Sequence, residues 1–157
     1  MKRAFQHRFG FLVVEIGRLY SQQFDRLARE KLGLSQAQCR LLGVLAAHDE
    51  DEPVSQAELA QKVGVSAMAV AALSDRMAAA GWIERRPSPH DRRINHLHMK
   101  PAARKALERA LAISDDLTND VLAVMTAAER AQLIALLGKA RERLLSRAGG
   151  GSEEKMP

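Results

Sequence analysis

The side chains with the clearest chemical potential form a cluster of positive charge between residues 85 and 100. The stretch holds five cationic side chains and one carboxylate, which are Arg85, Arg86, Arg92, Arg93, Lys100 and Asp91. A hairpin tip with this charge can lie against phosphates or insert an arginine into a narrow minor groove of DNA. The same charge is also compatible with a solvated turn, so the elements around the cluster must decide between the two interpretations.

Two histidines in the same stretch have a spacing that metal ligands can use. His96 and His98 are two residues apart, so they share one face of an extended strand. The intervening Leu97 and the following Met99 occupy the face that a strand turns toward the core. We therefore expect the histidines to point toward solvent or DNA, and we predict neither a metal site nor a cofactor.

The residues around the cluster predict the scaffold that holds it. The segments "WIERR" at 82–86 and "INHLHM" at 94–99 alternate in polarity like two strands flanking the turn "PSPHD". Upstream, residues 55–80 read as two short helices around "KVGVS", where Gly64 makes the turn and Ser66 caps the second helix. Because a helix-turn-helix followed by a two-stranded wing is a DNA-binding layout, the charged tip gains a role in DNA binding.

Helices are also predicted on both sides of this unit. Apolar residues recur with helical spacing over 5–31, and Gly33 has the position of a C-cap. The capping boxes "SQAQ", "SQAE" and "TAAE" predict helices over about 35–48, about 55–62 and about 127–147. Pro101 opens one more long helix.

The wide apolar stripes of the first and last helices need a partner surface, which favours a homodimer. We assign residues 1–34 and 101–147 to dimerisation helices and residues 35–100 to a winged helix-turn-helix domain. Residues 148–157, with "GGGSEEKMP" and no apolar pattern, are assigned to a disordered tail.

Composition narrows the class of protein. The chain has 157 residues, of which 46% are hydrophobic and only 4% aromatic, and this balance favours helices. A net charge of +5 favours anionic partners. The single cysteine, Cys39, excludes an internal disulfide and suits a reducing compartment. The early apolar run "FGFLVV" is too short for a secretory signal and no stretch is long enough to span a membrane, so we expect a cytoplasmic protein.

Catalysis finds no support in the sequence. It contains no glycine-rich phosphate loop, no nucleophile elbow and no metalloprotease helix motif. We therefore expect that the protein is not an enzyme.

The region from "SQAELAQKVGVSAMAV" to "RRINHLHMKPAARKAL" resembles the MarR (multiple antibiotic resistance regulator) family. The resemblance is carried by "LAQKVGVS", by "DRMAAAGWIER" and by a wing motif made of Asp91, Arg93, Leu97 and Met99. With the flanking helices it extends over residues 5–147. It implies a mainly α winged helix-turn-helix fold with long N- and C-terminal dimerisation helices and a two-stranded β wing. It also implies a homodimeric, ligand-responsive repressor that binds a pseudo-palindromic operator in double-stranded DNA.

The family resemblance further implies roles for individual residues. Arg93 would enter the minor groove with Asp91 orienting it, while Arg92, Arg86 and Arg85 approach phosphates, and His90 lies beside them. The helix at 66–80 would lie in the major groove. Its expected contact residues are Ser66, Ala67, Met68, Ala71, Ala72, Ser74 and Arg76, while Val70, Leu73 and Met77 face inward.

The sequence departs from the family pattern in two ways. Lys100 replaces the threonine that usually precedes the proline, and alanines occupy outward positions of the recognition helix that commonly carry polar side chains. Alanine methyl groups can touch a thymine methyl group but form no hydrogen bonds with base edges. We therefore expect modest sequence discrimination together with strong salt dependence.

A ligand site is implied by the resemblance as well. Family members often bind small aromatic or phenolic acids between the dimer helices and the DNA-binding lobe. A ring and several cations are available for such a ligand, and the candidates are His7, Arg8, Phe11, Arg18 and Arg40. Cys39 is open to two interpretations, a buried small residue or an oxidant sensor, and the first is favoured.

One alternative function stays open at this point. The alanine-rich recognition helix is also compatible with a winged-helix dimer that acts through protein–protein contacts without specific DNA binding. Replacement of Arg93 by alanine distinguishes the two, because only a DNA-binding regulator needs that side chain.

Overall fold

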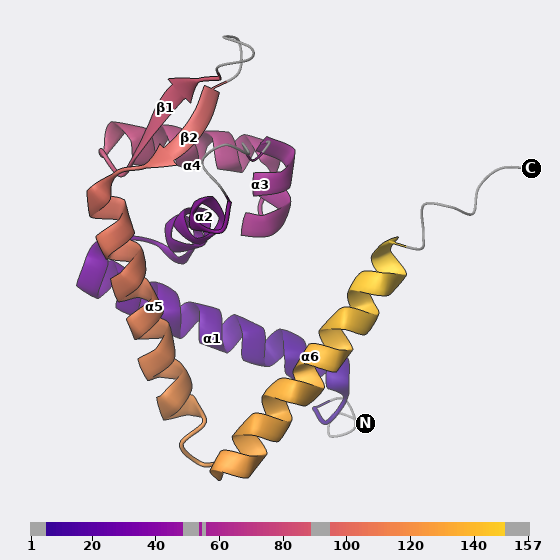
Figure 1. Cartoon of the computed structure of the whole chain (residues 1–157). Coiled ribbons are helices and arrows are strands. Elements are labelled where there is room, and N and C mark those ends of the chain that lie inside the picture. Colours follow the sequence, from indigo (N-terminus) through magenta and orange to yellow (C-terminus); the bar gives the residue numbers. More distant parts are fainter. Residues whose placement is uncertain (1–5, 49–53, 55, 89–94, 150–157) are drawn as a thin grey trace, which may run out of the picture. The chain divides into compact units, whose positions relative to one another are not determined.

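The computed structural model describes residues 6–48, 54, 56–88 and 95–149 of the chain. Its elements, in order, are α1 (Phe9–Leu32), α2 (Gln36–Ala46), α3 (Gln56–Val63), α4 (Ala67–Ala79), β1 (Ile83–Pro87), β2 (Asn95–Met99), α5 (Pro101–Val121) and α6 (Ala127–Gly149) (Figure 1). The chain divides into two compact units, Met1–Leu117 and Thr118–Pro157, and the boundary falls within α5. The predicted fold class, mainly helical with a two-stranded wing, is confirmed.

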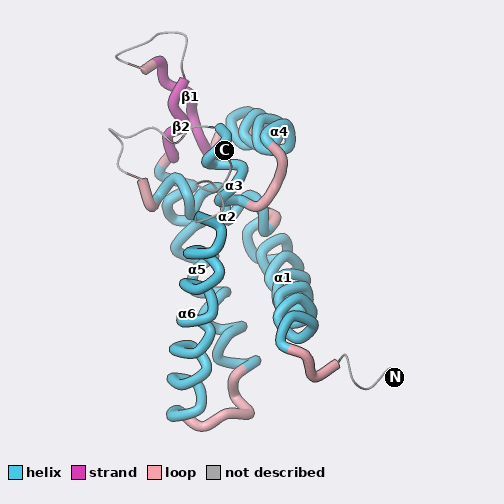
Figure 2. Tube along the Cα trace, turned by 90° about the vertical axis from the view of Figure 1, so that its right-hand side faces the viewer, coloured by secondary structure: helices cyan, strands magenta, loops and turns pink. Residues whose placement is uncertain are grey.

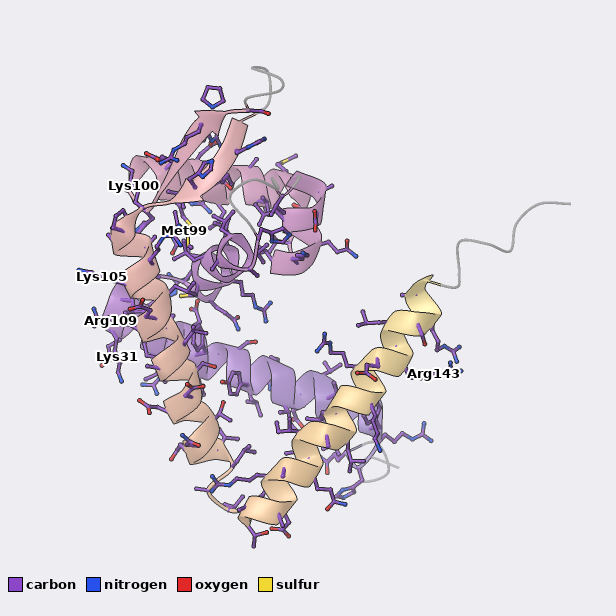
Figure 3. The ribbon with its side chains drawn as sticks, viewed as in Figure 1. Lys31, Met99, Lys100, Lys105, Arg109 and Arg143 are labelled. Carbon is purple, nitrogen blue, oxygen red and sulfur yellow. The ribbon has the colours of Figure 1, made fainter. Side chains whose placement is uncertain are left out.

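The first unit is built around α2, which contacts α1, α3 and β2. The core contains leucines and valines from α2, α3 and α4, and the largest fully buried side chains include Leu41, Leu42, Leu59, Val63, Val70, Met77 and Ile83. Helix α5 adds a stripe of small buried side chains at Ala103, Ala106 and Ala110, which lets its backbone approach its neighbours closely. The Arg109 side chain of α5 donates to the Lys31 carbonyl at the end of α1, at 3.2 Å (Figure 3).

Local chemistry explains where the helices of this unit begin and end. Ser35 and Gln38 form the predicted capping box at the start of α2, and Ser66 accepts from the Ala69 amide at the start of α4. Gly33 ends α1 with φ of 68°, and Gly64 turns the chain between α3 and α4 with φ of 80°. Both angles lie in the left-handed region, which glycine enters without steric cost. The second predicted capping box, at 55–58, falls partly outside the described residues because it needs Ser55.

The two strands form an antiparallel pair beside α4 (Figure 2). Ile83 is opposite Met99, Arg85 is opposite Leu97 and Pro87 is opposite Asn95. The base of the pair is closed by the Lys100 amide, which donates to the Trp82 carbonyl at 3.0 Å. The wing therefore emerges directly from the end of α4, with only Ala80, Gly81 and Trp82 between them.

The second unit contains the last turn of α5 and all of α6. Thr126 and Glu129 form the predicted capping box of α6, with the Thr126 amide donating to the Glu129 carboxylate at 2.8 Å. This helix exposes large apolar side chains, which are Ile134, Leu136, Leu137, Leu144 and Leu145. Isolated exposed leucines are ordinary, but this many on one helix form a large exposed apolar surface.

Two helix boundaries differ from those expected. Helix α1 begins at Phe9 and not at residue 5, and α6 continues through Ala148 and Gly149, which had been assigned to the tail. The remaining tail residues, 150–157, lie outside the described residues.

Candidate nucleic-acid interface

Helix α4 presents one face to the core and leaves the other free of protein. Val70, Leu73, Ser74 and Met77 are buried, at the i, i+3, i+4 and i+7 positions of a helical stripe. The exposed positions include Ser66, Ala67, Met68, Ala72, Asp75 and Arg76, with Met68 83% exposed and Ala71 half-buried. Most of the expected contact residues therefore lie on one accessible, largely apolar surface.

Ser74 is the exception, and its expected contact with DNA is not supported by this structure. Its side chain is fully buried, and its hydroxyl has no hydrogen-bond partner within the described part of the chain. The helical period had already placed Ser74 one turn after Val70, on the buried stripe. A polar side chain suggested an exposed position, but the position of Ser74 on the helix places it in the core.

The wing has two different faces. Residues directly opposite each other in an antiparallel pair share a face, so Glu84, Arg86, His96 and His98 lie together. The other face carries Ile83, Arg85, Leu97 and Met99, and it includes the apolar side chains that pack against the core. The expectation that Leu97 and Met99 face inward is confirmed, and the two histidine rings lie on the opposite face with their centroids 6.5 Å apart.

Both arginines of the described wing are paired with carboxylates. Arg85, which was expected to approach phosphates, forms an ion pair with Asp75 of α4. Arg86 donates from Nε to Glu84 on its own strand at 2.7 Å. The local positive charge counted in the sequence is therefore reduced in space by Asp75 and Glu84. Arg76, in contrast, is exposed and forms no ion pair with another described residue.

His90, Asp91, Arg92 and Arg93 lie outside the described residues. Their DNA contacts remain predictions that rest on the family resemblance.

A cavity of about 470 Å³ lies between α1, α2 and α5 within the first unit. Its lining is mostly apolar, from Phe24, Leu107, Ala110 and others, and Tyr20 supplies a polar edge. The Tyr20 hydroxyl lies 3.0 Å from the Ser114 hydroxyl and donates to the Ser114 carbonyl at 3.1 Å. Such a site fits a compact, largely apolar molecule with a few polar groups.

Of the predicted ligand residues, only Arg40 lines this cavity, because the others lie on different surfaces of α1 or before it. Arg18 lines a second hollow of about 570 Å³ that also contains Asp25, Arg26 and Arg29. His7, Arg8 and Phe11 are exposed and line neither hollow. Sequence reasoning missed Tyr20 and Ser114, although an aromatic residue with a polar tip on the inward stripe of α1 was a usable signal.

Cys39 also lines the cavity, and 6% of the residue is exposed. Burial, reinforced by the negative charge of Asp25, raises the pKa of the Cys39 thiol to about 11. Because the thiolate is the nucleophile, a thiol that stays protonated reacts slowly with oxidants. This agrees with the interpretation of Cys39 as a buried small residue.

Two kinds of structural feature are absent from the described part of the chain. No group of three or more His, Cys, Asp or Glu side chains is placed to hold a metal ion there. No described helix combines the length and the apolar character needed to cross a membrane.

Comparison with known proteins agrees with this geometry. A sequence profile of the MarR family matches residues 32–94. The HTH-type transcriptional regulator YdgJ of Bacillus subtilis, itself uncharacterised, is 30% identical over 112 residues, which are 71% of this chain and 66% of that protein. The chain thus spans slightly less than two thirds of that relative.

Solved structures match over a larger share of the chain. Wild-type MarR from Escherichia coli, in its apo form, aligns with a TM-score of 0.74 and 23% identity, covering 85% of this chain and 96% of that one. The MarR family protein Rv2887 of Mycobacterium tuberculosis, in complex with salicylic acid, aligns with a TM-score of 0.69 and 25% identity, with the same coverage.

Proposed function

Because this chain belongs to the MarR family, we propose that it is a homodimeric transcriptional regulator that binds a pseudo-palindromic DNA operator, acts in the cytoplasm and is not an enzyme. The observation that carries the proposal is the free face of α4 next to the wing. A helix of this kind enters the major groove while a wing reaches the neighbouring backbone or minor groove. We further propose that it represses transcription and is released by a small ligand.

Base recognition in this proposal is limited by the alanines of α4. Three exposed side chains can contact base edges. Ser66 and Arg76 can form hydrogen bonds with them, and Met68 can make apolar contacts. The tip residues Arg92 and Arg93 supply the remaining contacts, to phosphates and to the minor groove. Since phosphate contacts release counterions, affinity falls steeply as salt rises.

The dimer is supported by the apolar surfaces of the two terminal helices. The first half of α1 exposes Phe9, Phe11, Leu12, Val13, Val14, Ile16 and Leu19, and only Phe24 and Ala28 further along this helix are buried. Helix α6 exposes a comparable set. A second copy of the chain would cover both surfaces and give the two recognition helices that a palindromic operator needs.

The cavity beside Tyr20 is the proposed ligand site. Rv2887 binds salicylic acid, and a small aromatic or phenolic acid fits the apolar walls and the Tyr20 and Ser114 hydroxyl groups of this cavity. Arg40 at its edge is the cation available to a carboxylate. The proposed ligand site is therefore this cavity, and not the surfaces that carry His7, Arg8, Phe11 and Arg18.

The decisive experiment measures binding of the purified protein to DNA flanking its own gene, by fluorescence anisotropy, with a scrambled duplex as reference. We expect preference for the flanking DNA and a loss of affinity of at least about ten-fold between about 50 mM and about 200 mM salt. Arg93→Ala should weaken binding by about ten-fold or more. Arg26→Ala, which removes the same charge from an exposed position on α1, is the matched control.

The same experiment also tests the alternative function, a winged-helix dimer that works only through protein contacts. It is favoured by the exposed apolar face of α4, above all by Met68. Equal affinity for both duplexes, with no effect of Arg93→Ala, would support that rival and refute the proposed regulator.

The dimer is tested separately by sedimentation of Leu144→Glu. A carboxylate at this exposed apolar position of α6 should shift the protein toward monomer. Gln132→Glu changes the net charge by the same amount at an exposed polar position of the helix and should leave the dimer intact.

A further inference from the structure

The ion pair between Asp75 and Arg85 joins α4 to the wing, the two elements that contact adjacent DNA grooves in the proposed function. Asp75 lies in the second half of α4, and Arg85 lies in the middle of β1, ten residues later in the chain. The same junction is packed on its inner side by Met77 and Ile83, both fully buried. The Trp82 amide also donates to the Met77 carbonyl there, at 3.0 Å. The ion pair therefore adds a second link between helix and wing, on the exposed side of the junction.

The strand register separates the two wing arginines by role. Arg86 shares the outer face with His96 and His98, whereas Arg85 shares the face of Ile83 and Leu97. A side chain on that second face is directed toward the body of the domain, and Arg85 there meets the Asp75 carboxylate. Its guanidinium is thus occupied by α4 and is not presented on the outer face of the wing.

Asp75 also needs this partner for an electrostatic reason. Its side chain is 63% exposed on the helix that faces DNA in the proposed function. An uncompensated carboxylate at that place would repel the phosphates of the duplex. The Arg85 guanidinium, paired with the Asp75 carboxylate, cancels this charge locally.

We propose that Asp75 and Arg85 are positioning residues for DNA binding, which hold the wing at one fixed orientation relative to the recognition helix. The inference rests on the proposed DNA-binding function. Arg85 then contributes to affinity through Asp75 and not through a phosphate. Exposed ion pairs add little to folding stability, so the effect of this pair is expected in binding and in wing mobility.

The pair formed by Glu84 and Arg86 provides a matched control within the same wing. It consists of the same charges, but both residues lie on β1, so it connects no two elements. Asp75→Asn and Glu84→Gln each remove one carboxylate next to a wing arginine. If charge alone mattered, both variants would bind DNA more tightly, because each removes repulsion and frees an arginine.

The experiment measures operator affinity for Asp75→Asn, Arg85→Gln, the double variant and Glu84→Gln. We expect Asp75→Asn to weaken binding by up to about five-fold, the upper range for one exposed ion pair, with an unchanged unfolding midpoint. Arg85→Gln should weaken binding similarly, and the double variant should bind no worse than either single variant. Glu84→Gln should bind at least as tightly as the wild type.

A second measurement does not depend on DNA. Amide hydrogen exchange over residues 82–88 and 95–100 should accelerate in Asp75→Asn and Arg85→Gln but not in Glu84→Gln. The positioning role is overturned if exchange is unchanged, or if Asp75→Asn binds DNA more tightly, as Glu84→Gln does. Failure of the wild type to bind any operator would instead refute the proposed function, and the exchange data would still decide the role of the ion pair.

Discussion

The buried thiol of Cys39 predicts a loss of folding stability in alkaline solution. Burial raises its pKa from an ordinary value of 9.0 to about 11 in the folded protein. Between these values the unfolded chain ionises while the folded chain keeps its proton. The stabilisation is therefore fully present below pH 9 and is lost as the pH rises through about 11.

The size of the effect follows from the two pKa values. One pKa unit corresponds to about 1.4 kcal/mol, so the full loss above pH 11 approaches roughly 3 kcal/mol. At about pH 10, where the folded thiol is still mostly protonated and the unfolded one mostly ionised, the loss is roughly half of this. This is a measurable fraction of the stability of an ordinary domain.

The assay compares urea unfolding of the wild type and of Cys39→Ala at several pH values from about 7.5 to about 10.5. Lysine and tyrosine titrations act equally on both proteins, and the packing lost in the variant is independent of pH, so the difference between the two isolates the thiol. The advantage of the wild type over Cys39→Ala should shrink as the pH rises. A constant difference would refute the assignment of Cys39 as a buried, protonated thiol.

Three further predictions concern local structure in the first unit. Gly33→Ala should lower the free energy of unfolding by about 1 kcal/mol because φ is 68° there, whereas Gly43→Ala, inside α2 with room for the methyl group, should be neutral or stabilising in the same urea titration. Ser35→Ala removes half of the capping box of α2 and should cost about 1 kcal/mol, and a change below a quarter of that would contradict the role of the cap. Tyr20→Phe should cost about 1 kcal/mol through the lost hydrogen bonds to Ser114, and Ser114→Ala should then add less than it does alone, which a double-mutant cycle in thermal unfolding measures.

Features governed by neighbours in the chain were predictable. The capping boxes at Ser35 and Thr126 involve residues three positions apart, so their chemistry is complete within one helical turn. The wing followed from alternation, which assigned Leu97 and Met99 to the core side. In each case the interacting groups are close in sequence, so the local sequence pattern is enough to predict the structure.

One misplaced residue had a signal that its side-chain type concealed. Ser74 lies on the buried stripe of α4 by helical period, although its polar side chain suggested the surface. Arg85 is exposed as expected, and only its partner, the Asp75 carboxylate, was not foreseen. Periodicity describes which face a residue occupies, while polarity describes only what that residue prefers.

The sequence by itself determined the order of helices and strands, their caps and turns, and the winged helix-turn-helix layout, because short-range hydrogen bonding and periodic burial are properties of neighbouring residues. Only the tertiary structure decided that Arg85 pairs with Asp75 and that Tyr20 of α1 meets Ser114 of α5 across a cavity. Tyr20 and Ser114 are 94 positions apart. Their contact depends on how whole helices pack, and the packing sums many small interactions that no single stretch of the sequence contains.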